Sequence, residues 1–138
     1  MAEKVTAAVR TSPQTTEFRE YDMPNIEDDA ALLKVEVAGI CGTDVKFYSK
    51  PPFEGPCIMG HENIGYIAKA GKTFQERRGL KEGDLVFAEH YVGCMDCEFC
   101  HKGEYRLCMF TDWRKFPDGL RFGYTLAERA PHLFGGFA

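Results

Sequence analysis

The sequence has no long apolar run and no cluster of basic residues. No segment is apolar over the roughly 20 residues that a membrane-spanning helix needs, and the opening MAEKVTAAVR lacks the apolar core of a secretory signal. The 17 Lys and Arg residues are outnumbered by 21 Asp and Glu, which gives a net charge of −4 and disfavours nucleic acid as a partner. We therefore expect a cytoplasmic protein that contacts neither membrane nor nucleic acid.

A dinucleotide-binding fingerprint is also missing. No G-x-G-x-x-G motif follows a predicted strand, and the one nearby pair, Gly135-Gly136, has no helix after it. The sequence therefore predicts no Rossmann cofactor domain within residues 1–138.

What is present favours one mainly β domain. The chain has 138 residues, with 14 glycines and 7 prolines, which suits a turn-rich architecture. A short helix is predicted over 43–48 with Thr43 as its N-cap, and a polar segment covers 71–83. Alternating apolar residues predict strands over 5–9, 15–21, 31–38, 63–70 and 84–89. We expect a small, irregular β-barrel with long functional loops.

Four of the six cysteines follow a metal-binding spacing. Cys94, Cys97, Cys100 and Cys108 form a C-x2-C-x2-C-x7-C pattern, in which short spacers curl thiolates around one ion and the longer spacer closes a tetrahedron. Four thiolates with no open position are typical of structural zinc, here in a lobe spanning about 93–109. Two disulfides, four unrelated buried thiols or an iron–sulfur cluster are the alternatives, and a reducing compartment disfavours the disulfides.

A second candidate metal site combines Cys41 with His61. Each lies in a glycine-flanked segment beside a predicted strand end, GICGTD at 39–44 and GHENIG at 60–65. A catalytic zinc needs three protein ligands and an open fourth position, so this pair alone is incomplete. Taken singly, Cys41 also fits a small buried residue and His61 a hydrogen-bonded turn residue.

These motifs together resemble the zinc-dependent medium-chain dehydrogenase/reductase family. The matching segments run in family order: GICGTD at 39–44, GHE at 60–62, GDLV at 83–86, the four cysteines at 94–108 and GGFA at 135–138. The resemblance implies a GroES-like fold for residues 1–138 and catalytic zinc bound by Cys41 and His61. It also implies that the third zinc ligand and the Rossmann domain for NAD or NADP lie downstream.

The resemblance further implies roles for three polar neighbours of this zinc. Glu62 is similar to an acid that lies behind the ligands and can approach the metal. Asp44 is similar to the carboxylate that orients the ligating His61. Thr43 resembles a hydroxyl residue that relays the alcohol proton outward, since a hydroxyl both donates and accepts.

Other positions are assigned less directly by the resemblance. Many relatives carry a histidine where this chain has Lys46, which we interpret as a surface charge. His90 and Trp113 fall near substrate-lining positions, although His90 also fits a hydrogen-bonded strand histidine. Cys57 has no partner in either cysteine set and is predicted to be a small buried or loop thiol.

The predicted function is that of a catalytic domain in an NAD(P)-dependent alcohol or polyol dehydrogenase. Its partner would be a small alcohol or carbonyl substrate, and a homo-oligomer is possible. Without a third ligand and a cofactor domain, we expect no turnover by this chain alone. The alternative is a stand-alone zinc-binding interaction or scaffold module, and a zinc-free reductase of the same superfamily would need neither cysteine set.

Overall fold

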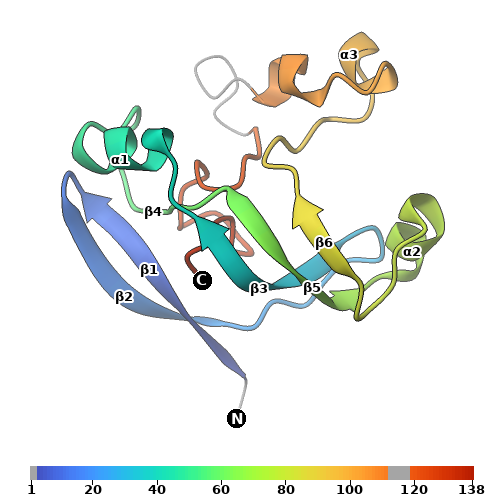
Figure 1. The fold of residues 1–138 in the computed structure, drawn as a ribbon, viewed down its shortest axis with the longest axis horizontal. Helices are drawn as coiled ribbons and strands as arrows, with labels where there is room; N and C mark the ends of the chain where they lie inside the picture. Colours follow the sequence, from blue (N-terminus) through green and yellow to red (C-terminus); the bar gives the residue numbers. More distant parts are fainter. Residues whose placement is uncertain (1–2, 112–118) are drawn as a thin grey trace.

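The computed structural model describes residues 3–111 and 119–138, which form a mainly β fold with short helices (Figure 1). The strands are β1 (Lys4–Ser12), β2 (Thr15–Asp22), β3 (Ala31–Gly39), β4 (Cys57–Ile58), β5 (Glu62–Ala70) and β6 (Leu85–Ala88). The helices are α1 (Gly42–Ser49), α2 (Lys72–Arg78) and α3 (Glu98–His101), followed by the 3-10 turns η1 (Tyr105–Leu107) and η2 (Met109–Thr111).

The strands form two three-stranded antiparallel sheets. One has the order β2-β1-β4 and the other β3-β5-β6. In Figure 1 the C-terminal segment ends between the two sheets. There the backbone N–H of Ala8 in β1 donates to the carbonyl of Phe137 at 2.8 Å, so the C-terminal segment is tied into the barrel. The predicted irregular β-barrel is confirmed.

The hydrophobic core is small and joins β1 to the C-terminal segment. Its fully buried members are Ala7, Val9, Ile58 and Ala127, with Phe137 packed against them. Because these residues come from both ends of the chain, the core fixes the C-terminal segment relative to the first sheet.

Alternation along β5 decides which side chains reach the site. Asn63 and Ile67 are buried while Glu62 is exposed, as the two-residue repeat of a strand requires. Gly65 lies on the buried side, where an added Cβ would come within 2.1 Å of the Lys34 carbonyl oxygen. The close approach of β3 to β5 therefore depends on that glycine.

The helical segments differ from the sequence prediction in two places. The prediction of Thr43 as N-cap is wrong: α1 begins at Gly42, and the N-cap is Cys41, whose Sγ accepts the Thr43 N–H. Helix α2 lies inside the polar segment 71–83 and ends at Gly79, whose positive φ of 64° is favourable for glycine. Cys57 is buried in β4, which agrees with the prediction of a small buried thiol.

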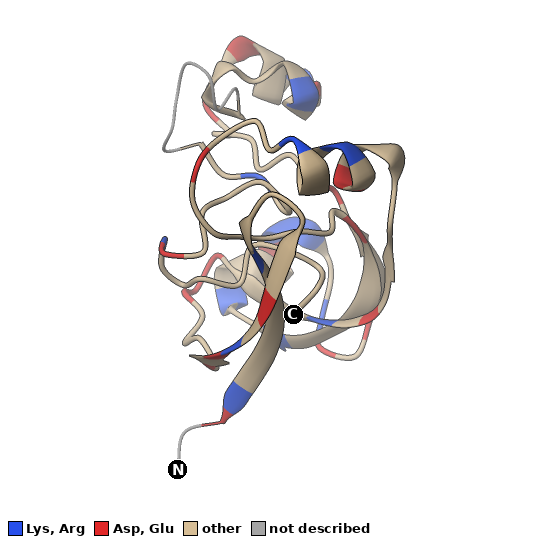
Figure 2. Cartoon of the chain, turned by 90° about the vertical axis from the view of Figure 1, so that its left-hand side faces the viewer, with Lys and Arg blue, Asp and Glu red and all other residues tan. Residues whose placement is uncertain are grey.

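The surface carries charges of both signs. Figure 2 shows basic and acidic residues interspersed on the face that it views. Among the residues that the structure describes, no helix is long and apolar enough to cross a membrane.

Candidate metal centres

The first centre forms where β3 ends and β5 begins. Gly39 pairs with Glu62 in the β3–β5 ladder, which brings the residues just beyond the ladder, Cys41 and His61, to the same end of the sheet. Their Sγ and Nε2 atoms are 3.2 Å apart. The structure therefore brings Cys41 and His61 together, and their role as zinc ligands stays a prediction.

The Asp44 carboxylate lies next to both candidate ligands, Cys41 and His61. Its Oδ2 accepts the Cys41 backbone N–H at 3.0 Å, and its Oδ1 accepts the Gly60 N–H at 3.3 Å. The same Oδ1 lies 3.5 Å from His61 Nδ1. Asp44 is only 4% exposed, so its charge is held by backbone N–H groups rather than by water.

The carboxylate of Glu62 completes a group of three donors. The donor atoms of Cys41, His61 and Glu62 all lie within 4.8 Å of one another. Gly39 makes room for this carboxylate, because a Cβ there would be 2.7 Å from Glu62 Oε2. Two ligands of a tetrahedral zinc, at Zn–S about 2.3 Å and Zn–N about 2.0 Å, stand about 3.5 Å apart, so the sulfur–nitrogen pair needs little movement to accept the ion.

The imidazole of His61 is suited to bind metal through one nitrogen. Nε2 faces the Cys41 sulfur, while Nδ1 is buried and makes no hydrogen bond of good geometry within the described part of the chain. A metal-binding histidine commonly donates its other N–H to a carboxylate, and the Asp44 Oδ1 at 3.5 Å is the group in that direction. The donor set therefore fits zinc.

Tyr124 is an aromatic neighbour that the sequence analysis missed. Its ring centroid lies 5.1 Å from that of His61 and 5.6 Å from that of Phe47 in α1. Burial raises the pKa of the Tyr124 phenol to about 12, with Asp44 adding to the rise and a hydrogen bond with Thr43 opposing it. The residue falls in a segment without apolar periodicity, so no pattern singled it out.

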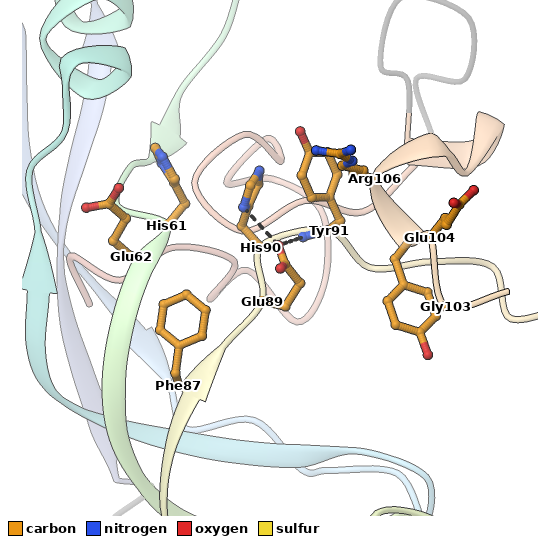
Figure 3. Close-up of a pocket in the computed structure, with 10 residues that line it drawn as sticks. His61, Glu62, Phe87, Glu89, His90, Tyr91, Gly103, Glu104 and Arg106 are labelled. Carbon is orange, nitrogen blue, oxygen red and sulfur yellow. Dashed lines mark hydrogen bonds and ion pairs between the residues drawn. The ribbon is translucent and has the colours of Figure 1, made fainter. Parts of the chain in front are cut away.

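A pocket of about 470 Å³ opens beside this centre. Figure 3 shows His61 and Glu62 at one side, His90 and Tyr91 in the middle and Arg106 opposite. Its lining is completed by Phe87, Glu89, Gly103, Glu104 and Tyr105. His90 therefore lies in the predicted pocket, whereas Trp113 falls outside the described residues.

His90 lies among aromatic and charged groups. Its ring is 3.9 Å from Tyr91 and 5.2 Å from His61, centroid to centroid. Partial burial lowers the pKa of His90, and the nearby Glu89 carboxylate, 3.1 Å from Nδ1, opposes that shift. The structure therefore favours a neutral imidazole that can exchange hydrogen bonds with a ligand in the pocket.

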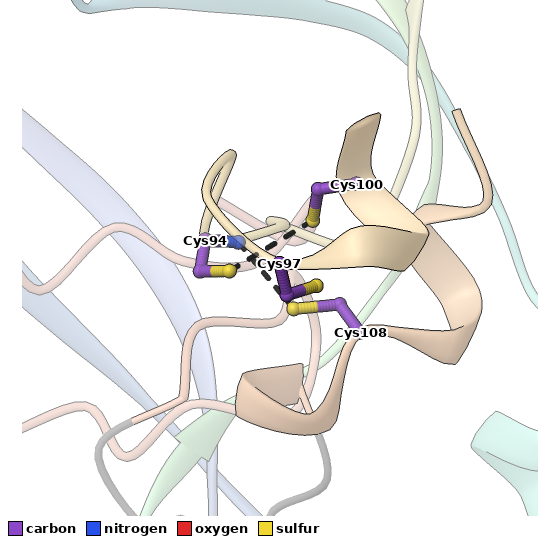
Figure 4. Close-up of side chains that lie close together, drawn as sticks. All are labelled: Cys94, Cys97, Cys100 and Cys108. Carbon is purple, nitrogen blue, oxygen red and sulfur yellow. Dashed lines mark hydrogen bonds between the residues drawn. The ribbon is translucent and has the colours of Figure 1, made fainter. Parts of the chain in front are cut away.

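The second centre is the four-cysteine lobe (Figure 4). All six cysteines of the chain are unpaired thiols. The four sulfurs of Cys94, Cys97, Cys100 and Cys108 lie within 4.8 Å of one another, and those of Cys94 and Cys100 are 3.9 Å apart. Thiolates around a tetrahedral zinc at about 2.3 Å stand about 3.8 Å apart, so the four cysteines fit a closed zinc site.

The environments of the lobe sulfurs differ. Backbone N–H groups, first that of Asp96 and then that of Cys97, lower the pKa of Cys94 to about 7. Burial instead raises the pKa of Cys100 to about 12. Because zinc binds thiolates, metal binding by this lobe must release protons.

The lobe also forms one wall of the pocket. Gly93 leaves room for Tyr105, since an added Cβ would lie 3.1 Å from the Tyr105 ring and 2.8 Å from Cys100 Sγ. The Cys108 N–H donates to the Tyr105 carbonyl at 3.0 Å. Tyr105, in the pocket wall at 103–106, is therefore held close to the cysteine lobe by its contact with Gly93 and its hydrogen bond with Cys108.

Comparison with known proteins gives consistent matches. The family model of the alcohol dehydrogenase GroES-like domain matches residues 27–138. The probable alcohol dehydrogenase adh of Mycobacterium tuberculosis is 37% identical over 135 residues, covering 97% of this chain and 35% of the relative. Sorbitol dehydrogenase of Bombyx mori is 35% identical over 108 residues, covering 75% of this chain and 30% of the relative. The chain thus spans about a third of the length of these relatives.

Solved structures agree with these matches. Alcohol dehydrogenase TADH from Thermus sp. ATN1 superimposes with a TM-score of 0.70 at 28% identity, covering 88% of this chain and 32% of that one. Galactitol-1-phosphate dehydrogenase from Escherichia coli gives a TM-score of 0.74 at 26% identity, covering 97% and 34%. The chain therefore belongs to the zinc-dependent medium-chain alcohol dehydrogenase family, in which it corresponds to the N-terminal GroES-like domain.

Proposed function

We propose that this chain is the zinc-binding catalytic domain of an NAD(P)-dependent alcohol or polyol dehydrogenase. The observation that carries the proposal is the cluster of Cys41, His61 and Glu62 at the edge of the pocket, with Asp44 buried behind it. A scaffold module would have no use for a group of three donors of which two, His61 and Glu62, line a pocket. The substrate class follows from relatives named as alcohol, sorbitol and erythritol/L-threitol dehydrogenases.

Cys41 and His61 would hold zinc, with Glu62 as a third donor within reach. A zinc ion held there would supply the positive charge that makes a substrate hydroxyl more acidic, and the NAD or NADP of the whole enzyme would be the hydride acceptor. The four lobe cysteines would hold a second, structural zinc in residues 93–109.

The remaining residues would handle the substrate and its proton. Thr43, at the first turn of α1, would accept the proton of the substrate hydroxyl and pass it outward. Asp44 would keep His61 oriented through Nδ1. His90 would contact the substrate from the middle of the pocket, and Lys46, exposed on α1, is too solvated to be needed for this path.

The experiment is a cobalt titration of zinc-free protein, followed through the thiolate-to-cobalt absorption. We expect one tight equivalent at the four cysteines and one weaker equivalent at Cys41, His61 and Glu62. The variants Cys41→Ala and His61→Ala should each lose only the weaker equivalent. A single equivalent in the wild type, unchanged in both variants, would contradict metal binding by Cys41, His61 and Glu62 in this chain. Alcohol oxidation with NAD or NADP by the chain alone would contradict our expectation that turnover requires the rest of the protein.

A further inference from the structure

The loop that carries Tyr124 is fixed against the first metal centre. Arg121 pairs with Tyr91 in an antiparallel bridge, and the Phe122 N–H donates to the His90 carbonyl at 3.0 Å. The Gly123 N–H donates to the Phe134 carbonyl at 2.6 Å. These bonds hold the loop between the pocket and the C-terminal segment, so the position of Tyr124 is determined by the fold.

Gly123 brings this loop into direct contact with the backbone at His61. An added Cβ at Gly123 would lie 3.0 Å from the Gly60 carbonyl oxygen and 3.2 Å from His61 Cβ. The residue also has a φ of 79°, a conformation that glycine adopts easily. The next residue, Tyr124, is thus placed over the His61 side chain.

The Tyr124 ring is held between α1 and His61. It meets Phe47 edge to face, with centroids 5.6 Å apart and an interplanar angle of 83°. It meets His61 in a tilted arrangement at 5.1 Å and 39°, and lies 6.2 Å from His90. The ring is therefore in contact with both Phe47 and His61, in geometries that aromatic rings prefer.

The contact adds to the restraint that Asp44 places on His61. Nδ1 is 3.5 Å from Asp44 and lacks a hydrogen bond of good geometry among the described residues. Rotation about the terminal side-chain bond would turn Nε2 away from the Cys41 sulfur. A ring packed on the face of the imidazole opposes that rotation directly.

We propose that Tyr124 is a positioning residue of the first metal centre, whose ring fixes the plane of the His61 imidazole. This inference rests on the proposed function, because it assigns His61 to the metal. Tyr124 itself lies beside the donors and is not counted among them.

Two variants separate the ring from the hydroxyl. Tyr124→Phe keeps the ring contact with His61, whereas Tyr124→Leu removes it. Groups that orient a metal-binding histidine typically contribute 10- to 100-fold to metal affinity. We therefore expect Tyr124→Leu to raise the dissociation constant of the more weakly bound cobalt, at Cys41 and His61, by about 10- to 100-fold. Tyr124→Phe should leave this constant within about threefold of wild type.

The matched control is Phe134→Leu. Phe134 lies in the C-terminal segment that holds the Tyr124 loop through a backbone hydrogen bond to Gly123, and this bond does not depend on the side chain. The Phe134 ring pairs with Phe122, at 6.4 Å between centroids. This variant should bind the weaker cobalt as the wild type does. The tight cobalt of the four cysteines should be unchanged in every variant, and urea denaturation verifies that the barrel of each one is folded.

A second readout does not depend on metal binding. In the metal-free protein, long-range nitrogen–proton NMR spectra should show one defined His61 ring state in wild type and Tyr124→Phe, and an averaged one in Tyr124→Leu. If wild type binds only one cobalt, the proposed function fails and these spectra alone decide the role of Tyr124. The inference is overturned if the His61 signals are the same in Tyr124→Leu as in wild type, or if Tyr124→Phe is as defective as Tyr124→Leu.

Discussion

Asp44 lies 3.5 Å from His61 Nδ1 and also accepts the backbone N–H of Cys41 at 3.0 Å. One buried carboxylate thus connects both candidate zinc ligands, although they are 20 residues apart in the chain. It also accepts the Gly60 N–H and closes the first turn of α1. Metal affinity and local folding should therefore depend on the same side chain.

We expect Asp44→Ala to weaken both properties. Loss of the carboxylate behind His61 should lower affinity for the weaker metal by about 10- to 100-fold. Loss of the helix cap and of a charged acceptor for buried N–H groups should reduce the free energy of unfolding by about 2–4 kcal/mol. Cobalt titration and urea denaturation measure the two effects. Glu36→Ala, in β3 with an exposed side chain, is the control and should change neither; a wild-type metal affinity in Asp44→Ala would contradict the orienting role.

The four-cysteine lobe should be separable from the barrel. Cys108→Ser removes one thiolate of the closed site, and we expect the tight zinc to be lost and residues 94–111 to lose their protection from hydrogen exchange. The barrel should keep its structure, because its core of Ala7, Val9, Ile58 and Ala127 lies outside the lobe. Zinc analysis and hydrogen exchange check this, and Cys41→Ser should leave the tight zinc bound. Retention of tight zinc by Cys108→Ser would contradict the four-thiolate assignment.

Most strands and the metal-donor residues could be predicted from the sequence. Alternating residues in the sequence predicted both β3 and β5, buried and exposed residues alternate along β5 in the structure, and the cysteine spacing limits how the lobe can close. Their alternation, however, says little about α2, whose sequence KTFQERR buries no residue and so has no apolar face to detect. Cys41 as the cap of α1 was missed because sulfur is an uncommon acceptor there.

The contacts around the site were harder to predict for a different reason. Tyr124 reaches His61 through a loop whose course depends on long-range bonds, such as that between Phe122 N–H and the His90 carbonyl, and Arg106 lines the pocket from the turn η1. No local pattern encodes such pairings. The same holds for Glu62, whose carboxylate approaches the Cys41–His61 pair only because Gly39 faces it across the ladder.

Cys57 should make stability depend on alkaline pH. Burial raises the pKa of its thiol to about 12, whereas a cysteine in an unfolded chain titrates near 8.5. Between about pH 8.5 and 12 the unfolded chain therefore binds fewer protons than the folded one, and the free energy of unfolding falls as pH rises, by at most about 1.4 kcal/mol per pH unit. Below that window the contribution is fully present.

Denaturation of the zinc-loaded protein at pH 8 and pH 10 tests this expectation. The fall in stability between the two should be smaller in Cys57→Ala than in wild type, whatever the cost of the substitution at pH 8. Alkylation of the thiol gives an independent measurement. Cys57 should react only on unfolding, because the residue is 1% exposed and its thiol donates to the Gly123 carbonyl at 3.3 Å. Equal pH dependence in the two proteins would show that the thiol ionises alike in both states.

Gly123 offers the sharpest test of how closely the C-terminal loop contacts the metal centre. Gly123→Ala must accommodate both a positive φ of 79° and a Cβ that lies 3.0 Å from the Gly60 carbonyl oxygen and 3.2 Å from His61 Cβ. Gly79→Ala is the matched control, because Gly79 also has a positive φ, 64°, but an added Cβ there meets nothing within 4 Å.

Backbone strain alone should cost about 1 kcal/mol in each variant. The steric contact should add about 1–3 kcal/mol in Gly123→Ala, and because the displaced atoms belong to His61 and its neighbour, the weaker cobalt should be bound less tightly in this variant only. Urea denaturation and cobalt titration of both proteins measure the difference. Equal destabilisation with unchanged cobalt binding would mean that the loop can move away from His61 freely, and that its contact does not position the metal ligand.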